Sequence, residues 1–325
     1  MQDTSKGFPK IIYGNPAKPL SDFVVGLDKN RYPFQSIPDA VKAAGQQAAA
    51  TGAPQVVYAT PPPVSAPWQL GDGLVLPNFV NLIGVCGDRF GFRNPVRCQG
   101  RILIGDGLNL EAEGSRSICD ITIDNRGTAQ AGALTIDGPG FVDVILQRVQ
   151  LRCDTGTALD CDAQSIGLYM AESLVTSNDP ALPACRVAFQ PGGFPFVIFR
   201  DTNTNNPAGG NAAEFDGITL ISRLAEFAAV GVPAIVADFC ALSHFDDVLT
   251  SAGGGPTALL VTDSAVSVIG ACLFNATGPA VIDGATSSVR WYNGQFSTTL
   301  TAPSVSAALT RIALQNQPGS VIAFP

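Results

Sequence analysis

The most constraining feature of this chain is a repeat that runs from about residue 132 to residue 300. Each repeat opens with a short apolar run, passes an Asp, enters a second apolar run and closes in Gly, Asn, Thr or Ser, as in PTALLVTDSAVSVIGACLFNATG from Pro256. The repeats begin at residues 132, 156, 184, 211, 233, 256 and 279. Short strands and turns at this period, without helical spacing, indicate a solenoid of stacked coils.

The composition agrees with a solenoid and excludes several function classes. The 325 residues are 46% hydrophobic and 14% charged, which is too apolar for a disordered chain, and 34 Gly and 24 Pro suit a chain that turns corners constantly. A net charge of −8 disfavours a general nucleic-acid binder. With one His and no C-x-x-C pair among eight Cys, a zinc site is disfavoured. We interpret the cysteines as small buried side chains, and a Cys153–Cys161 disulfide remains an alternative.

The N-terminal segment differs in kind from the repeats, because all five lysines lie within the first 42 residues. Residues 1–22 have no core of their own, and no secretory leader is visible. We predict an extended docking arm that contacts a partner through an apolar group, and a frayed terminus is the alternative. The residues of this group are Phe8, Ile11, Ile12 and Tyr13.

Residues 23–99 read as an N-terminal cap made of a helix, the first coils and a loop. SIPDAVKAAGQQAAATG predicts a helix that begins at Ser36 or Asp39, with Ile37, Val41 and Ala44 or Ala48 on one face. The strands QVVYAT and FVNLIGV follow. A loop then carries a basic cluster, which is either solvated or contacts an acidic partner or a glycan. Its residues are Arg89, Arg93, Arg97 and Arg101.

The order FQSIPDAVKAA, PQVVYATPPPV, LPNFVNLIGV resembles the opening of pectin-lyase-like right-handed parallel β-helix proteins, and is closest in style to viral spike or fibre chains. The sequence departs from the family at Pro61-Pro62-Pro63-Val64, where such chains often carry Pro-Gly-x-Tyr. The resemblance implies an all-β fold: a right-handed parallel β-helix solenoid with an N-terminal capping helix and an extended arm. We expect the coils over residues 100–302 and a C-terminal cap or contact tail over residues 303–325.

The sequence contains few residues or motifs that indicate a catalytic site. Asp246 and Asp247 resemble the paired Asp of the polygalacturonase group, and His244 just before them could join in acid–base chemistry. The Gly-His-Gly and Arg-x-Lys elements of that group are missing, and no Lys follows Lys42. A polar turn between strands is therefore the favoured interpretation of this segment.

An Asp recurs near the first strand of each coil, and stacked coils lie about 4.8 Å apart, so these carboxylates could form a ladder. Capping of Asx turns is one explanation, and shared calcium is the other and the only cofactor we consider. The residues are Asp137, Asp160 or Asp162, Asp216, Asp238, Asp263 and Asp283.

We interpret the chain as a non-enzymatic structural protein of a virion, such as a fibre, a spike or a capsid-associated component. The expected partners are two further copies in a homotrimer and other virion proteins bound by the arm, without nucleic acid or a membrane span. Two alternatives remain: a polysaccharide hydrolase or lyase, and a glycan-binding rod that stacks sugars on Trp291 and Tyr292. Candidate intersubunit contacts on the outer face are Phe194, Phe196, Phe199, Trp291 and Tyr292.

Overall fold

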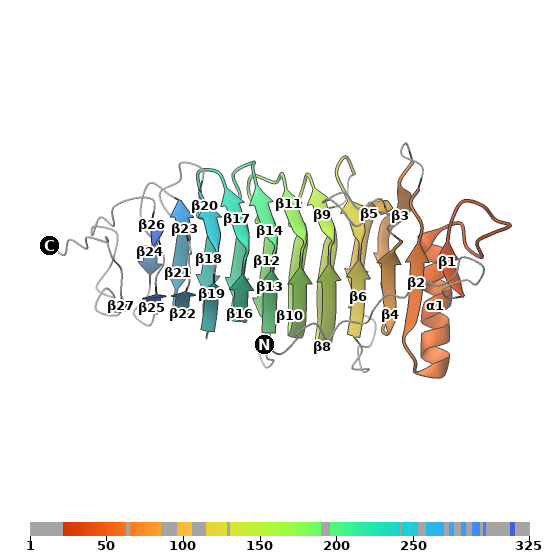
Figure 1. Ribbon diagram of the computed structural model, residues 1–325, viewed down its shortest axis with the longest axis horizontal. Helices are drawn as coiled ribbons and strands as arrows, with labels where there is room; N and C mark the ends of the chain where they lie inside the picture. The colour runs from red at the N-terminus through yellow and green to blue at the C-terminus, as the bar shows by residue number, and fades with distance from the viewer. Residues whose placement is uncertain are drawn as a thin grey trace, which may run out of the picture.

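The protein is an elongated parallel β-helix with one α-helix at its N-terminal end, as seen in a computed structural model (Figure 1). The structure describes residues 22–62, 66–85, 96–105, 115–128, 131–189, 196–240, 242–246, 248–252, 258–269, 273–275, 281–283, 288–292, 295–296 and 313–315. The strand pairings between coils are parallel, so the all-β parallel β-helix predicted from the repeat is confirmed.

The coils stack into three sheets, and the chain passes through them in the order III, I, II. Sheet I contains β1 (Phe23–Val25), β2 (Gln55–Ala59), β4 (Val80–Gly84), β6 (Ser115–Cys119), the second halves of β8 (Leu134–Gln147) and β10 (Leu159–Ala171), β13 (Phe196–Arg200), β16 (Thr219–Arg223), β19 (Leu242–Asp246), β22 (Ala265–Ile269), β25 (Ser288–Tyr292) and β27 (Ala313–Gln315). Sheet II contains the first halves of β3 (Trp68–Val75) and β5 (Val96–Ile104), then β7 (Ile121–Asp124), β9 (Gln150–Cys153), β11 (Leu174–Ser177), β14 (Asn203–Asn206), β17 (Glu226–Ala229), β20 (Leu249–Ser251), β23 (Leu273–Asn275) and β26 (Gln295–Phe296). Sheet III contains the second halves of β3 and β5, the first halves of β8 and β10, then β12 (Cys185–Phe189), β15 (Ala213–Asp216), β18 (Ile235–Asp238), β21 (Leu259–Thr262) and β24 (Val281–Asp283).

The predicted repeat matches the coils. Each predicted start precedes a strand of sheet III by one to three residues, from residue 132 ahead of β8 to residue 279 ahead of β24. The expected boundary between residues 99 and 100 falls inside β5, because this strand bends from sheet II into sheet III. The first coils lie within residues 23–99, the segment expected to hold the helix, the first coils and a loop.

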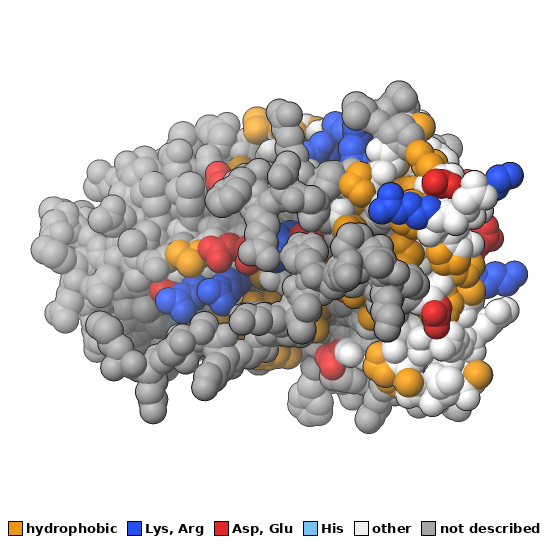
Figure 2. Space-filling model, turned by 45° about the vertical axis from the view of Figure 1, so that its right-hand side comes forward, with side chains coloured by type: hydrophobic (Ala, Val, Ile, Leu, Met, Phe, Trp, Pro, Cys, Tyr) orange, Lys and Arg blue, Asp and Glu red, His pale blue; other side chains and the backbone are white. Residues whose placement is uncertain are grey.

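Helix α1 (Ile37–Thr51) covers the N-terminal end of the solenoid, where it contacts β1, β2, β3 and β4. Ser36 is its N-cap and accepts a hydrogen bond from the Asp39 backbone N–H, and Gly52 ends it in the left-handed conformation. The buried face is Ile37, Ala40, Val41, Ala44 and Ala48, as predicted. Charged side chains of both signs are interspersed with apolar ones over this end (Figure 2). In the part of the chain that the structure describes, no helix is both long and apolar enough to cross a membrane.

The interior is filled by side chains from alternate strand positions. Phe199, Phe215 and Phe227 come from the three different sheets and pack together, with ring centroids 5.8–6.4 Å apart. Phe199 is therefore a core residue, which corrects its prediction as an outer-face contact, whereas Phe196 of the same strand is 42% exposed. The difference arises because side chains alternate between the two faces of a sheet, so residues an odd number of positions apart in one strand face opposite sides.

The described cysteines support their interpretation as packing residues. Cys98, Cys153, Cys161, Cys185 and Cys240 are buried, and Cys119 is half-buried. All six are free thiols, so the alternative of a Cys153–Cys161 disulfide is wrong. Burial raises the pKa of the Cys98 thiol to about 12, which keeps it protonated and unreactive.

The corner between sheets I and II is built by residues in the left-handed conformation rather than by glycine. Their backbone N–H groups continue the ladder to the next coil, for example from Arg148 to the Ala171 carbonyl. Side chains at this corner pair along the axis: Arg148 Nε lies 2.5 Å from Asp120 Oδ1, and this hydrogen bond raises the pKa of Arg148. The left-handed residues are Asp120, Arg148, Glu172, Asp201 and Leu224.

Candidate active site on sheet III

The outward face of sheet III carries a line of carboxylates in register. Asp137 pairs with Asp162 across β8 and β10, and Asp216 pairs with Asp238 across β15 and β18. Ala188 stands between the two pairs at the same position. The predicted ladder therefore exists on sheet III, at a coil spacing of about 4.8 Å.

A second outward line runs beside the first, two residues earlier on each strand. It brings Asp160, Arg186 and Glu214 into register on three successive coils. Arg186 Nη1 lies 3.1 Å from Asp160 Oδ1, and its Nη2 lies 3.6 Å from Asp162 Oδ2. Arg186 thus sits among the carboxylates of both lines.

Partial burial governs the protonation of this face. Burial is the largest influence on Asp160 and raises its pKa, although the nearby Arg186 acts in the opposite sense. Burial also raises the pKa of Glu214, whose Oε1 accepts a hydrogen bond from Asn211 Nδ2 at 2.9 Å. A carboxyl group with a raised pKa holds its proton at higher pH and can serve as an acid.

Asp216 and Asp238 form the most unusual pair on this face. The pKa of Asp216 is raised by burial first and by the charge of Asp238 second. Oδ1 of Asp238 is buried and has no hydrogen-bond partner among the described residues. A buried acceptor without a donor is costly, and it is free to accept a hydrogen bond from a ligand.

Phe239 follows Asp238 at the corner between sheets III and I. It is 62% exposed and has a left-handed backbone with φ of 47°. This conformation is strained for a residue with a Cβ, and a large exposed aromatic ring rarely serves the core. In the chain, Phe239 directly follows Asp238 of the Asp216–Asp238 pair.

One of the predicted ladder residues lies elsewhere, and another is placed only by its backbone. Asp263 occupies the corner with φ of 43°, because Thr262 takes the ladder position in that coil. Asp283 is in register with Thr262, but its side chain lies outside the described part of the structure. Within the described residues, no group of three His, Cys, Asp or Glu side chains could hold a metal ion, so the ladder does not gather into a calcium site there.

The sequence-predicted His244 and Asp246 lie on sheet I, apart from this ladder. His244 is half-buried at an outward position between Ile221 and Ser267. Asp246 Oδ2 contacts Arg223 Nε at 3.3 Å. Asp247 lies outside the described residues, so its pairing with Asp246 stays a prediction.

The remaining predicted contacts are placed only in part. Arg97 is exposed on sheet II, and Arg101 donates hydrogen bonds to the carbonyls of Asp72 and Ala131. β25 pairs Trp291 with Val268 and Tyr292 with Ile269, but the side chains of these two aromatic residues are not described. The residues that lie outside the described ranges are Phe8, Ile11, Ile12, Tyr13, Arg89, Arg93, Phe194 and most of the 303–325 tail.

Sequence reasoning did not single out three members of this face, namely Arg186, Glu214 and Phe239. A register signal for the first two exists, because each stands one residue after the opening apolar residue of its strand, as Asp160 does. Phe239 carries no such signal, since only the backbone conformation at the corner exposes its ring.

Comparisons with known proteins returned structural likeness alone. No protein-family model matches the chain, and none of the curated proteins matches it in sequence. Among solved structures, it is similar to the deglycosylated pectin methylesterase from Aspergillus niger, with a TM-score of 0.43 and 13% identity over 94% of this chain and 93% of that one. It is also similar to the A-module of the mannuronan C-5 epimerase AlgE6 from Azotobacter vinelandii, with a TM-score of 0.40 and 14% identity over 87% of this chain and 96% of that one.

Proposed function

We propose that sheet III is the active face of a polysaccharide-cleaving enzyme, with Asp216 and Asp238 as its two carboxylates. The observation that carries this proposal is the buried Oδ1 of Asp238, which has no hydrogen-bond partner among the described residues and belongs to a residue in register with Asp216, whose pKa is raised. Pairs of carboxyl groups whose environments push their protonation apart are typical of acid–base sites.

The placement of the pair on adjacent coils suits the course that needs the shorter separation of carboxyl groups. Asp216 and Asp238 stand at the same position of adjacent coils, which lie about 4.8 Å apart. Retaining glycosidases hold their carboxyl groups about 5–5.5 Å apart, whereas inverting enzymes leave about 6.5–9.5 Å. In this scheme Asp216 gives its proton to the glycosidic oxygen as the C–O bond breaks, and Asp238 bonds to the anomeric carbon. Water then releases the sugar and returns a proton to Asp216.

Two further features fit a sugar chain along this face. Phe239, which follows Asp238 in the chain, offers an exposed ring, and aromatic faces provide an apolar surface on which a sugar ring can lie. The charge of the face disfavours an acidic polymer, because like charges repel at close range and one Arg186 stands among six carboxylates. We therefore assign a neutral glycan as substrate. The six carboxylates are Asp137, Asp160, Asp162, Glu214, Asp216 and Asp238.

The test measures reducing ends released from a panel of neutral polysaccharides by the wild type, Asp216→Asn and Asp238→Asn. On a substrate that the wild type cleaves, each change should lower kcat at least about 100-fold, the scale expected when a catalytic acid or nucleophile is lost. Asp137→Asn, an exposed carboxylate at the same register position, is the matched control and should retain activity. Undiminished cleavage by both pair variants would remove the pair from consideration. Absence of cleavage across the panel by the wild type would overturn the enzyme proposal.

A structural rod is the second candidate, and one feature of sheet I favours it. Ile145, Tyr169, Ile198 and Ile221 occupy one outward position on four successive coils, and Phe196 lies beside them. Ile145 is 41% exposed and Phe196 is 42% exposed. An apolar stripe of this kind is typical of a protein–protein contact surface.

We propose that a second copy of the chain covers this stripe, because the same apolar stripe on another copy can pack against it across a symmetry axis. The stripe is bordered toward sheet II by Arg200 and Arg223, which contact the carboxylates of Asp201 and Asp246. The neutralised border leaves the apolar positions as the main source of affinity between copies. The virion setting and the trimer remain our predictions for such a rod.

Light scattering on the full chain and on a chain lacking residues 1–22 tests this second candidate. A stable oligomer that survives loss of the arm, and that Ile198→Glu dissociates, would support it. Leu182→Glu, an apolar residue 45% exposed outside the stripe, is the matched control and should leave the mass unchanged. A monomeric wild type would overturn the self-association proposal.

A further inference from the structure

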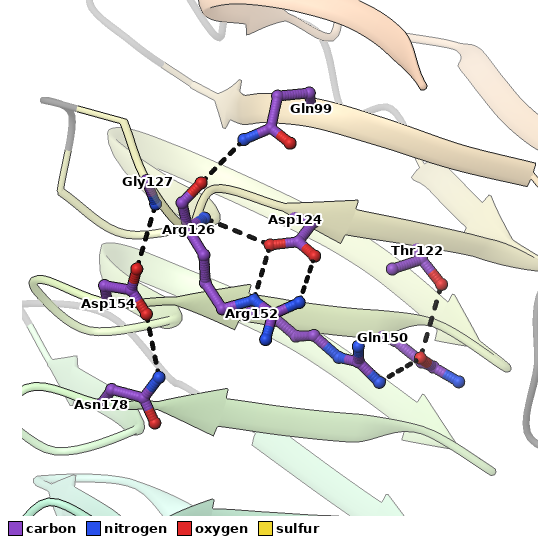
Figure 3. Close-up of polar contacts among 9 residues, drawn as sticks. All are labelled: Gln99, Thr122, Asp124, Arg126, Gly127, Gln150, Arg152, Asp154 and Asn178. Atoms are coloured by element: carbon purple, nitrogen blue, oxygen red, sulfur yellow. Dashed lines mark hydrogen bonds and ion pairs between the residues drawn. The ribbon is translucent and has the colours of Figure 1, made fainter. Parts of the chain in front are cut away.

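Sheet II carries a row of arginines that the proposed active face does not use. Arg97 in β5, Arg126 just after β7 and Arg152 in β9 lie on three successive coils. Figure 3 shows Arg126 and Arg152 extending over the same side of the sheet. Successive coils are about 4.8 Å apart. The three arginines stand at different positions of their coils, because Arg97 is in register with Thr122, Arg152 is in register with Asp124, and Arg126 follows Asp124 by two residues.

A polar floor lies under this row. Arg97 is in register with Thr122, and Thr122 is in register with Gln150. Thr122 is 4% exposed and Gln150 is 7% exposed, and Thr122 Oγ1 donates a hydrogen bond of 3.5 Å to Gln150 Oε1. A charge held over such a water-poor floor interacts more strongly with a ligand than it would in open solvent.

The three arginines differ in their partners. Arg126 is engaged by Asp124, with Nε 2.9 Å and Nη2 2.6 Å from its two carboxylate oxygens (Figure 3). Arg152 donates instead to the neutral Gln150 Oε1 at 2.9 Å. In the described part of the chain, neither Arg97 nor Arg152 has a carboxylate within ion-pair distance.

The electrostatics of Arg152 agree with a cation that Asp124, its partner in register, compensates only in part. Its pKa is lowered, first by burial and then by the charge of Arg126, with Asp124 opposing and Arg97 adding a smaller repulsion. An anion placed between Arg97 and Arg152 would relieve this repulsion. The planar guanidinium fork suits carboxylate and sulfate groups, which it binds through two parallel hydrogen bonds.

We propose that Arg97 and Arg152, with Arg126 between them, bind the carboxylate or sulfate groups of an acidic polysaccharide that lies along the solenoid axis over sheet II. A polymer is favoured over a single small anion because the cations are spread over three coils, a span of about 10 Å. This site is independent of sheet III, which is acidic and takes a neutral chain. It gives the exposed Arg97 a ligand of defined chemistry.

Binding of the full chain to immobilised polygalacturonate and dextran sulfate tests the proposal, with uncharged dextran as reference. The Arg97→Gln/Arg152→Gln double variant should bind at least about tenfold more weakly, because two charge-assisted contacts are lost. Lys29→Gln/Arg31→Gln removes two exposed cations near the N-terminal end and is the matched control, with unchanged affinity expected. Equal loss in both double variants, or equal binding of dextran, would overturn the assignment.

Three further readings separate this site from simpler explanations. Arg97→Lys/Arg152→Lys should keep part of the affinity, since charge remains while the fork is lost, and it guards against a misfolded glutamine variant. Wild-type affinity should fall as salt rises, and a salt-independent affinity would contradict an ionic contact. Tighter binding of single-stranded DNA than of either glycan would overturn the choice of ligand, as would inorganic sulfate that competes at the same sulfate concentration as the polymer.

Discussion

Asp124 on sheet II and Asp216 on sheet III are the same residue type at outward positions of the same solenoid, yet their surroundings are opposite. Burial tends to raise the pKa of Asp124, but two hydrogen bonds from Arg126 outweigh it and lower the pKa. Asp216 also experiences burial, but its neighbour in register is Asp238, and its pKa is raised. Hydrogen bonds from an arginine of the same coil reverse the effect of burial at Asp124, whereas burial, reinforced by Asp238, sets the direction at Asp216.

The difference teaches how a solenoid handles charge. Stacking places equivalent positions of successive coils directly opposite one another, so an opposite charge stabilises the stack and a like charge destabilises it. At the corner of sheets I and II, Arg148 lies between two acids and pairs with Asp120 and Glu172. Sheet III instead retains like charges in line, and a local conflict of this kind is expected where function, not folding, selects the residues.

The largest effect on stability is expected at a carboxylate whose two oxygens both accept hydrogen bonds from the backbone. Asp179 Oδ2 accepts a hydrogen bond from the Gly156 N–H at 2.7 Å, and its Oδ1 accepts bonds from the N–H groups of Ala181 and Leu182. Asp179→Ala should lower the free energy of unfolding by about 2 kcal/mol, because several backbone donors lose their acceptor. Urea denaturation measures it. Asn178→Ala removes one exposed contact to Asp154, so an equal loss in that control would contradict the prediction.

The Asp124–Arg126 pair should contribute less, because the Arg126 side chain is 43% exposed. Asp124→Asn should destabilise the protein by about 1 kcal/mol, the scale of a charge-assisted bond at a partly solvated site. A double-mutant cycle with Arg126→Gln isolates the coupling between the two side chains. A coupling energy of zero would mean that the ion pair does not stabilise the fold. The contrast between Asp124 on sheet II and Asp216 on sheet III would then lose its basis.

Much of the fold could be predicted from the sequence, because strands and turns recur along the chain at a nearly regular spacing. The repeat starts matched the strands of sheet III, and Ser36 with Gly52 marks the ends of α1. Inward and outward positions were harder, since neither Phe196 nor Phe199 carries a sign of its side. That assignment depends on the register with adjacent coils, which places Phe199 against Phe215 in the interior.

The site was predictable only as a line of Asp residues. The repeat pattern places Asp216 and Asp238 correctly, but it could not choose between Asp160 and Asp162, because both face outward and only the coil pairing assigns them to separate lines. It also assigned Asp263 to the ladder, although a one-residue difference puts Thr262 there. The unpartnered Asp238 Oδ1 and the exposed Phe239 ring are properties of packing, which a repeat pattern does not contain.

A smaller effect of opposite sign is expected on sheet III. Asp216→Asn should raise the free energy of unfolding at neutral pH by about 0.3 kcal/mol, a modest value because solvent screens the exposed part of this carboxyl group. The gain arises because burial first, and the charge of Asp238 second, disfavour the charged form of Asp216 in the folded protein. Thermal unfolding of this variant against Asp137→Asn measures it. Destabilisation by Asp216→Asn would show that its charge is used by the fold.

The pH dependence of that gain gives the finest test. Because the pKa of Asp216 is raised in the folded state above its ordinary value of 3.8, the folded protein holds this proton more tightly than the unfolded chain does. Stability therefore falls as pH rises from the ordinary value through the raised one, and the penalty is absent below the ordinary value, where both states are protonated. The difference between Asp216→Asn and the wild type should vanish near pH 3 and reach its full size at neutral pH.

Asp124→Asn should show the reverse sign. The lowered pKa of Asp124 stabilises the fold at pH values above the ordinary pKa, and this contribution is lost as pH falls through the lowered pKa. If the two stability differences had the same sign, the surroundings of Asp124 and Asp216 would not shift their pKa values in opposite directions.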